Sequence, residues 1–344
     1  MKRFFTAFSL ECKKVFSSRG FWIFAIVIFV LCIIITASFR SIGELIEGMD
    51  DSAVSGGGSS LTPGEAADLY QAQLDEYLAA IESGQTERKL SDTQETYLRN
   101  MIAICRYCEE KGIDMNKLVT FGSIGSLNMS AGDYVMTMSQ VVFAFVAIMA
   151  IVLAAKNFSG EIDDGTMRMQ LTRPIKRGAL LSAKYCSTFV ASMTMGIVFT
   201  VFFMVVGALF FDGASYDVLL VDAYQNVAII NTYTAILLLI LFNAVSVAAV
   251  IQFTMFAGTF VNKTGALAIP LVLYLFADTV AAFLYNTGLP FVGLFTNLKW
   301  TSALTPAGAP IRGMSIYTMM AVTLVWFAGM MTVNHLAFEK RDLK

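Results

Sequence analysis

The sequence predicts an all-α integral membrane protein with six transmembrane helices, an N-terminal interfacial amphipathic helix and a helical hairpin domain outside the membrane. Of its 344 residues, 56% are hydrophobic and only 15% are charged, and the mean hydropathy is +0.66. Soluble domains carry about 25% charged residues, so a water-soluble fold is excluded. Apolar stretches also recur at about 20 residues, the length that crosses the hydrocarbon core as a helix.

Six stretches are predicted to span the membrane. Five have the required length without interruption: Phe21–Phe39, Tyr134–Ala155, Phe189–Phe211, Tyr233–Val261 and Ser315–His335. The sixth, Gly265–Tyr285, is apolar apart from Pro270 and Asp278. The first stretch is longer than the apolar core of a cleaved signal peptide, and a charged segment precedes it.

The distribution of charge predicts the orientation. If the N-terminus is cytoplasmic, the cytoplasmic segments hold 15 Lys/Arg and 6 Asp/Glu, and the outer segments hold 9 and 19. The cytoplasmic segments are then 1–20, 156–188, 262–264 and 336–344, and the outer ones are 40–133, 212–232 and 286–314. Since short cytoplasmic loops are rich in Lys and Arg, both termini are expected in the cytoplasm of a bacterial cell, with the chain in its cytoplasmic membrane.

The N-terminal segment 1–20 is predicted to form a helix on the membrane surface. Apolar residues recur there at three- and four-residue spacing: Phe4, Phe5, Phe8, Cys12, Val15 and Phe16. Five Lys and Arg side chains supply the charges that anionic headgroups attract. A plain cytoplasmic tail is the alternative interpretation.

The largest segment outside the membrane, 40–133, is predicted to contain a helical hairpin. A Ser/Gly-rich linker, Ser52–Ser60, precedes two helix-start patterns, Thr62-Pro63-Gly64-Glu65 and Ser91-Asp92-Thr93-Gln94. Two helices of this length bury little core, so the hairpin should lean on the spans, a second copy or the membrane surface. Cys105 and Cys108 lie three residues apart, as structural thiols or as a redox pair.

The cytoplasmic segment 156–188 reads as a short helix lying across the membrane face. Gly165 permits a turn, Thr166 can cap a helix, and Pro174 ends it. Met167 and Leu171 share one face, and an apolar edge among charges is typical of a docking element. An ordinary intracellular loop is the alternative.

This segment resembles the signature of type-2 permeases of ABC exporters, which pair with separate ATPase subunits. The resemblance implies that residues 158–177 form the helix that couples to the ATPase, and that Lys184 belongs to the pattern. The coupling residues that it implies are Phe158, Glu161, Gly165, Thr166, Met167, Leu171, Pro174 and Arg177. It further implies two permease copies, as a homodimer or a heterodimer with a near relative, and two ATPases that bind ATP and Mg. The link 286–314 would dip back into the membrane at Leu289–Gly313.

No catalytic residue, cofactor or metal site is predicted in this chain. The nearest phosphate-loop candidate, Gly258–Thr264, has the wrong spacing and sits at the end of a span. His335 is the only histidine, which leaves no histidine-based triad or multi-histidine metal site. Asp278 is an ionisable residue within a span and hence a functional candidate. It is either part of an ion relay or a polar group near the outer leaflet that caps a broken helix or pairs with Lys299.

The cargo is the least determined feature. The chain holds 28 Phe and 19 Met residues, and Met side chains adapt to irregular apolar partners, which favours a hydrophobic or amphipathic cargo. Within the family, the sequence is most similar to exporters of amphipathic peptides such as phenol-soluble modulins. Export of sodium, a lipid or an antibiotic is the alternative, as is a membrane sensor or channel with a ligand-binding outer domain. Small residues that would permit helix approach in a dimer are Ser192, Gly196, Ala244 and Ala248. No nucleic acid partner is expected.

Overall fold

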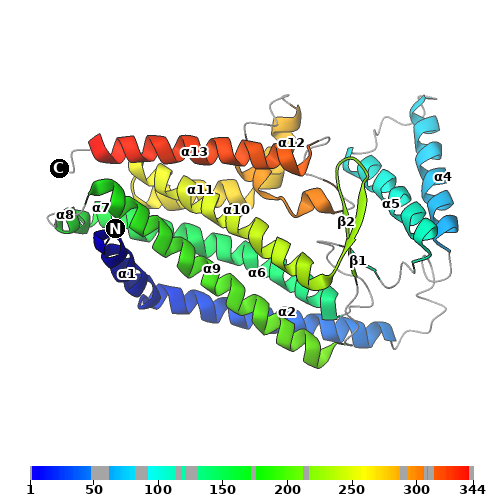
Figure 1. The fold of residues 1–344 in the computed structure, drawn as a ribbon, viewed down its shortest axis with the longest axis horizontal. Helices are drawn as coiled ribbons and strands as arrows, with labels where there is room; N and C mark the ends of the chain where they lie inside the picture. Colours follow the sequence, from blue (N-terminus) through cyan, green and yellow to red (C-terminus); the bar gives the residue numbers. More distant parts are fainter. Residues whose placement is uncertain are drawn as a thin grey trace.

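The computed structural model shows a long helical bundle with a smaller helical unit at one end (Figure 1). Helix α1 (Lys2–Phe16) and the end of the last helix lie at the opposite end of the bundle. The structure describes residues 2–47, 62–82, 92–113, 118–120, 131–171, 176–211, 217–286, 293–305, 308 and 314–340.

Within these residues, five helices are long and apolar enough to cross a membrane. They are α2 (Arg19–Glu47), α6 (Ala131–Ala154), α9 (Arg177–Phe210), α10 (Thr232–Phe260) and α13 (Ile316–Lys340). In the apolar stretch that begins with α6, 67% of the residues are buried, against 17% in the apolar stretches of α2 and α13. Helix α6 therefore forms the centre of the bundle, and α2 and α13 expose most of their side chains to the surroundings. A mainly helical, membrane-embedded protein is confirmed.

The stretch predicted as a further single span consists of two shorter helices. Helix α11 (Lys263–Leu275) begins where the Asn262 side chain accepts a hydrogen bond from the Gly265 backbone N–H. It ends at Phe276, whose backbone leaves the helical region, and α12 (Ala277–Asn286) follows. The 13 residues of α11 are too few to cross a membrane, because a helix rises about 1.5 Å per residue. Pro270 lies inside α11, so the interruption is not at the proline.

Helix α1 lies across the end of the bundle and packs against α9 (Figure 1). Its inner stripe consists of Ala7, Glu11 and Val15, all buried. The predicted apolar face flanks this stripe: Phe4 and Phe8 are half-buried and stack on each other at 6.3 Å, while Phe5 is 62% exposed. The inner stripe thus contains one acidic residue among apolar ones, which requires a partner inside the protein.

Helices α4 (Pro63–Glu82) and α5 (Asp92–Lys111) pack on each other at the far end of the bundle (Figure 1). The first helix begins with the predicted reciprocal cap: Thr62 N–H donates to Glu65 Oε2 at 2.8 Å, and Glu65 N–H donates back to Thr62 Oγ1. These bonds lower the pKa of Glu65. The predicted start of the second helix at Ser91 and the end of the first at Ser83 lie outside the described residues. Helix α5 ends at Gly112, whose φ of +65° closes a glycine C-cap.

A three-stranded sheet joins this unit to the bundle, which an all-α prediction does not contain. Its strands are β1 (Leu118–Thr120), β2 (Asp217–Val221) and β3 (Val227–Ile230), in the order β1-β2-β3. The first pair is parallel, with Leu118 opposite Asp217, and the second is antiparallel, with Val218 opposite Ile230. Ile104 and Cys108 of α5 pack against side chains of β2. The outer helices therefore lean on the sheet that connects α9 to α10.

Candidate functional site

The chain continues beyond α6 in a compact segment, residues 155–171, which we call the end-piece. A wide π-helical turn, η2 (Ala155–Gly160), leads into the short helix α7 (Glu161–Asp163). The backbone then reverses at Gly165, whose φ of +71° is readily adopted only by glycine, and α8 (Thr166–Leu171) follows. The turn predicted at Gly165 is confirmed. Single π turns inside helices occur frequently at functional sites.

Four charged side chains from three separate segments meet beside this end-piece. Lys184 of α9 is 1% exposed, and its Nζ lies 2.9 Å from Glu11 Oε1 and 2.6 Å from Glu161 Oε2. The second oxygen of Glu161 pairs with Lys14 of α1. Gln170 of α8 donates to Glu161 Oε2 at 2.9 Å. We call Glu11, Lys14, Glu161 and Lys184 the buried ion cluster.

The buried ion cluster holds the end-piece of α6 against α1 and α9. Glu11 and Glu161 are each 6% exposed, and a buried charge without its partner costs several kcal/mol, ~3–5 in measured cases. Any movement of one segment away from the others would leave such a charge unpaired. Burial, together with the neighbouring Lys184 ammonium, lowers the pKa of Lys14. The cluster therefore fixes the position of three segments that lie far apart in the sequence.

A second attachment connects the end-piece to α11. Asp163 Oδ2 accepts a hydrogen bond of 2.7 Å from the backbone N–H of Lys263, the first residue of α11. A carboxylate at a helix N-terminus satisfies an otherwise unpaired N–H and interacts favourably with the helix dipole. The Lys263 side chain also lies close to Gly160, where a Cβ would meet it at 3.4 Å.

Close packing against α10 and α13 completes the support of the π turn. A Cβ on Gly258 of α10 would lie 1.9 Å from Ser159 Oγ, so the two backbones approach as closely as a glycine allows. Phe158 is 1% exposed, and its ring lies 5.7 Å from that of Phe338 in α13. The end-piece is therefore in contact with α1, α9, α10, α11 and α13.

Most of the predicted coupling residues lie in this end-piece. Phe158 and Glu161 are buried in it, and Thr166 Oγ1 donates to the backbone oxygen of Glu161 at 3.4 Å. Arg177 begins α9. Pro174 lies outside the described residues, as does the Leu171 side chain.

The expectation that Met167 lies on an exposed docking edge is wrong. Met167 is 1% exposed and packs into the main core, whereas Met169 of the same helix is 68% exposed. Helix α8 is only six residues long, so a difference of two positions turns the side chain from one face to the other. The exposed face of α8 is consequently the face of Met169.

Sequence reasoning missed Glu11, Lys14 and Gln170. The signal for Glu11 was available, since it is the only acidic residue in segment 1–20 and is four residues from both Ala7 and Val15. An acidic residue on an apolar helical stripe predicts a buried cation opposite. Lys14 and Gln170 carry no comparable local signal.

Asp278 forms the ion pair that was one of its two interpretations. Lys299 Nζ lies 2.6 Å from both carboxylate oxygens of Asp278. The Asp278 side chain is 74% exposed and the Lys299 side chain is 42% exposed. The pair joins α12 to the segment after it, and it supports the structural interpretation over an ion relay.

Because the pair is exposed, we expect Asp278→Asn to change the free energy of unfolding by less than about 1 kcal/mol. Thermal unfolding in detergent, compared with Lys299→Met, measures this effect, and both variants should give the same small change. A much larger loss of stability in either variant would contradict the interpretation as an exposed ion pair.

Part of the predicted re-entrant link is described, and it is buried between helices. Two short 3-10 turns, η4 (Phe295–Leu298) and η5 (Ser302–Leu304), follow one another. Ser246 of α10 donates to the Leu298 carbonyl at 2.7 Å, and Thr323 of α13 donates to the Asn297 carbonyl. Segments 289–292 and 309–313 of the link lie outside the described residues. The described part is held by side-chain bonds to two of the long helices, as non-helical backbone in a membrane requires.

Cys105 and Cys108 are fully buried free thiols in α5. Burial raises the pKa of Cys105 to about 11 and raises that of Cys108. A thiol in this environment stays protonated and unreactive, which supports the structural interpretation. Among the described residues, no group of three His, Cys, Asp or Glu side chains could hold a metal ion.

Two of the small residues predicted for a dimer interface are used inside the chain. Ser192 is fully buried, and a Cβ on Gly196 would lie 2.5 Å from the Phe143 ring of α6. These residues bring α9 close to α6 within one copy. They are therefore not free to contact a second copy.

The fold and this site define a helical membrane protein in which the second long helix, α6, is followed by a charged end-piece that packs against other helices. Residues 100–344 match the family model described as "Protein of unknown function (DUF2705)", and the chain belongs to this family. The match begins within α5 and includes every long helix after α2. A comparison with curated proteins finds no match.

Proposed function

We propose that this chain is the transmembrane permease subunit of an ATP-driven ABC exporter in the bacterial cytoplasmic membrane. The observation that supports this most is the buried ion cluster, which attaches the predicted coupling segment, residues 158–177, to the helical bundle through Glu161. A segment that transmits the movement of an ATPase must be fixed to the helices that it moves. Glu161 and Lys184, both part of the signature, are the centre of that attachment.

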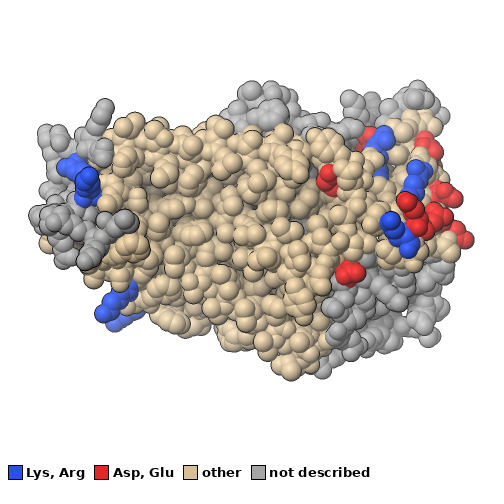
Figure 2. All heavy atoms as spheres, in the orientation of Figure 1, with Lys and Arg blue, Asp and Glu red and all other residues tan. Residues whose placement is uncertain are grey.

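The charge distribution supports a cytoplasmic position for the end-piece. On the face shown in Figure 2, the charged side chains lie toward the two ends, and the long middle is free of them. Acidic side chains, with some Lys and Arg among them, gather at the end that carries α4 and α5, whereas the coloured side chains at the opposite end are Lys and Arg (Figure 2). Under the positive-inside rule, α1, α8 and the end of α13 would face the cytoplasm, and α4 and α5 would lie outside.

The surface offered to an ATPase subunit is the outer face of α7 and α8. Asp163 and Asp164, which precede α8, are exposed, and Met169 of α8 is 68% exposed. An apolar side chain surrounded by charge is suited to enter a partner's groove, while Met167 and Glu161 hold the helix from the inside. Two ATPases, with bound ATP and Mg, and a second permease copy would complete the exporter.

The experiment that tests the proposal is recovery of an ATPase subunit with the tagged chain from native membranes. We expect Met169→Asp to reduce the recovered ATPase by about tenfold or more, since a charge in a docking pocket removes a central contact. Mass spectrometry identifies the partner, and gel filtration shows whether the permease remains monodisperse.

Two variants separate loss of docking from loss of folding. Met169→Leu should retain the ATPase, because it keeps an apolar side chain of similar size. Met167→Asp should instead destabilise the chain itself, because it buries a charge. Recovery of no ATPase with the wild type, or of a full complement with Met169→Asp, would contradict the proposal and favour a sensor or channel.

For the cargo, we propose a hydrophobic or amphipathic molecule, best matched by an amphipathic peptide. Helix α9, which is rich in Phe and Met, and helix α10, which is rich in Phe, support this class. Transport of a labelled amphipathic helical peptide into reconstituted vesicles, driven by ATP, tests it. ATP-driven movement of sodium without any response to peptides would replace the cargo and leave the permease proposal in place.

A further inference from the structure

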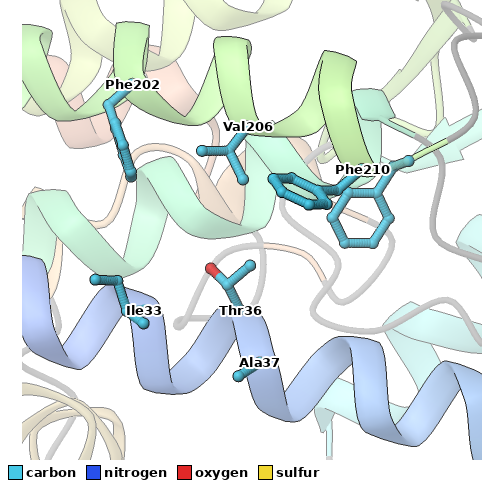
Figure 3. A pocket seen from close by; sticks show the side chains of 7 residues that line it. Ile33, Thr36, Ala37, Phe202, Val206 and Phe210 are labelled. Carbon is cyan, nitrogen blue, oxygen red and sulfur yellow. The ribbon is translucent and has the colours of Figure 1, made fainter.

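A cavity of about 320 Å³ lies between α2 and α9, near the point where α9 ends (Figure 3). Side chains of the two helices point toward each other across it: Ile33, Thr36 and Ala37 from α2, and Phe202, Val206 and Phe210 from α9. The lining is almost entirely hydrocarbon. It belongs to no part of the end-piece described above.

The cavity is an open groove bordered by aromatic side chains. Both α2 and α9 pack against α6, whose Tyr134 contacts the lining residues Thr36 and Phe211. The Phe211 and Tyr134 rings stack with centroids 4.6 Å apart. The ring of Phe29 lies 5.4 Å from that of Phe202, which also lines the groove.

The one polar group in the lining is already satisfied. Thr36 Oγ1 lies 2.7 Å from the backbone oxygen of Cys32 and 2.8 Å from the Tyr134 hydroxyl. Since a threonine hydroxyl has one proton and donates it to Cys32, Tyr134 donates to Thr36. The lining therefore offers a ligand only apolar contact.

The surface around the opening is one that lipid covers. Ile34 on α2 and Val205 on α9 flank the cavity and are 55% and 54% exposed. Both belong to helices long and apolar enough to cross the membrane. An unfilled space here would forfeit the dispersion contacts of its lining, and the molecules beside it are lipid chains.

The length and cross-section of the cavity determine which kind of molecule fits within it. Phe202 and Phe210 are eight residues apart on α9, or roughly 12 Å along a helix. The volume of about 320 Å³ over that length gives a cross-section of roughly 27 Å². A helix about 10 Å wide needs roughly 80 Å², so a whole helix does not fit within this space. An extended hydrocarbon chain does.

We propose that this cavity binds one acyl chain of a membrane lipid, which lies between α2 and α9. The lipid would fill the gap between the first long helix and the α6–α9 pair. The inference rests on the cavity alone and is independent of the exporter proposal.

Photo-crosslinking of the full chain in vesicles of phospholipid with a diazirine on one acyl chain tests the proposal. Adducts, mapped by mass spectrometry, should be more frequent on residues 33–37 and 202–211 than on Leu324 of α13, which is 59% exposed. Val206→Trp should lower these adducts by about fivefold or more, because an indole occupies much of the space. The matched control is Val205→Trp on the neighbouring lipid-facing position, which should leave the labelling of the cavity unchanged.

A second variant guards against misfolding of the first. Ala37→Phe fills the cavity from α2, and it should reduce labelling on the α9 wall without changing gel-filtration behaviour. Equal labelling of the cavity and of α13, or equal effects of the tryptophans at 205 and 206, would overturn the proposal. So would a disulfide between two copies through Ala37→Cys that replaces the lipid adducts, since it would assign the surface to a dimer.

Discussion

Replacing Lys184 by methionine is expected to destabilise the protein by about 3–5 kcal/mol. This is the largest effect that we expect from replacing any one charged residue. Methionine keeps most of the volume but leaves Glu11 and Glu161 facing each other without the ammonium between them. Glu11 would lose its ion-pair partner and Glu161 would keep only Lys14, although both carboxylates are 6% exposed. Thermal unfolding in detergent, followed by fluorescence, measures the loss.

A compensating variant distinguishes the ion cluster from mere packing. Adding Glu11→Gln and Glu161→Gln to Lys184→Met removes the unpaired charges and should restore much of the stability, because a neutral polar group costs less to bury than a charge. Lys13→Met, at an exposed position of α1, should stay within about 0.5 kcal/mol of the wild type. If Lys184→Met unfolds at the same temperature as Lys13→Met, the cluster does not hold the end-piece.

Gly258→Ala is expected to destabilise the protein by about 1–3 kcal/mol through overpacking. The added methyl group would lie 1.9 Å from Ser159 Oγ and 3.2 Å from the Phe158 ring, both in the π turn. Neither neighbour has free space, since Ser159 and Phe158 are each 1% exposed. The substitution should therefore push the π turn away from α10, and with it Glu161.

The matched control for this variant is Gly329→Ala in α13. No atom lies within 4 Å of the Cβ that it adds, so the helix preference for alanine should make it neutral or stabilising by up to about 1 kcal/mol. Ser159→Gly combined with Gly258→Ala should recover most of the lost stability, because it removes the clashing oxygen. Equal melting temperatures for the two alanine variants would show that the close approach of α10 is not tight.

In the predicted coupling segment, residues 158–177, the turn at Gly165 could be predicted from the sequence, whereas the direction of the Met167 side chain could not. Glycine at 165 predicted a turn because a positive φ is a property of the residue itself, and the structure has that turn. The direction of Met167 depended on how α8 rotates against the bundle. That rotation follows from Gln170 and Glu161 meeting, and a contact of this kind is not visible in the sequence.

The sequence by itself determined the class of this protein and the position of its long helices. Apolar run length and local capping act within a few residues, so they can be read without the rest of the fold. The Thr62–Glu65 cap and the five apolar helices follow from such local signals.

Only the tertiary structure decided which distant segments meet. Lys184 lies 173 residues from Glu11 in the chain, and β1 pairs with a strand almost 100 residues away. The break at Phe276 and the cavity between α2 and α9 likewise depend on how helices pack. Hydropathy records whether a residue prefers lipid to water, but it carries no information about which partner lies opposite. The ion cluster exists because packing brought the buried Glu11, Glu161 and Lys184 together with the half-exposed Lys14.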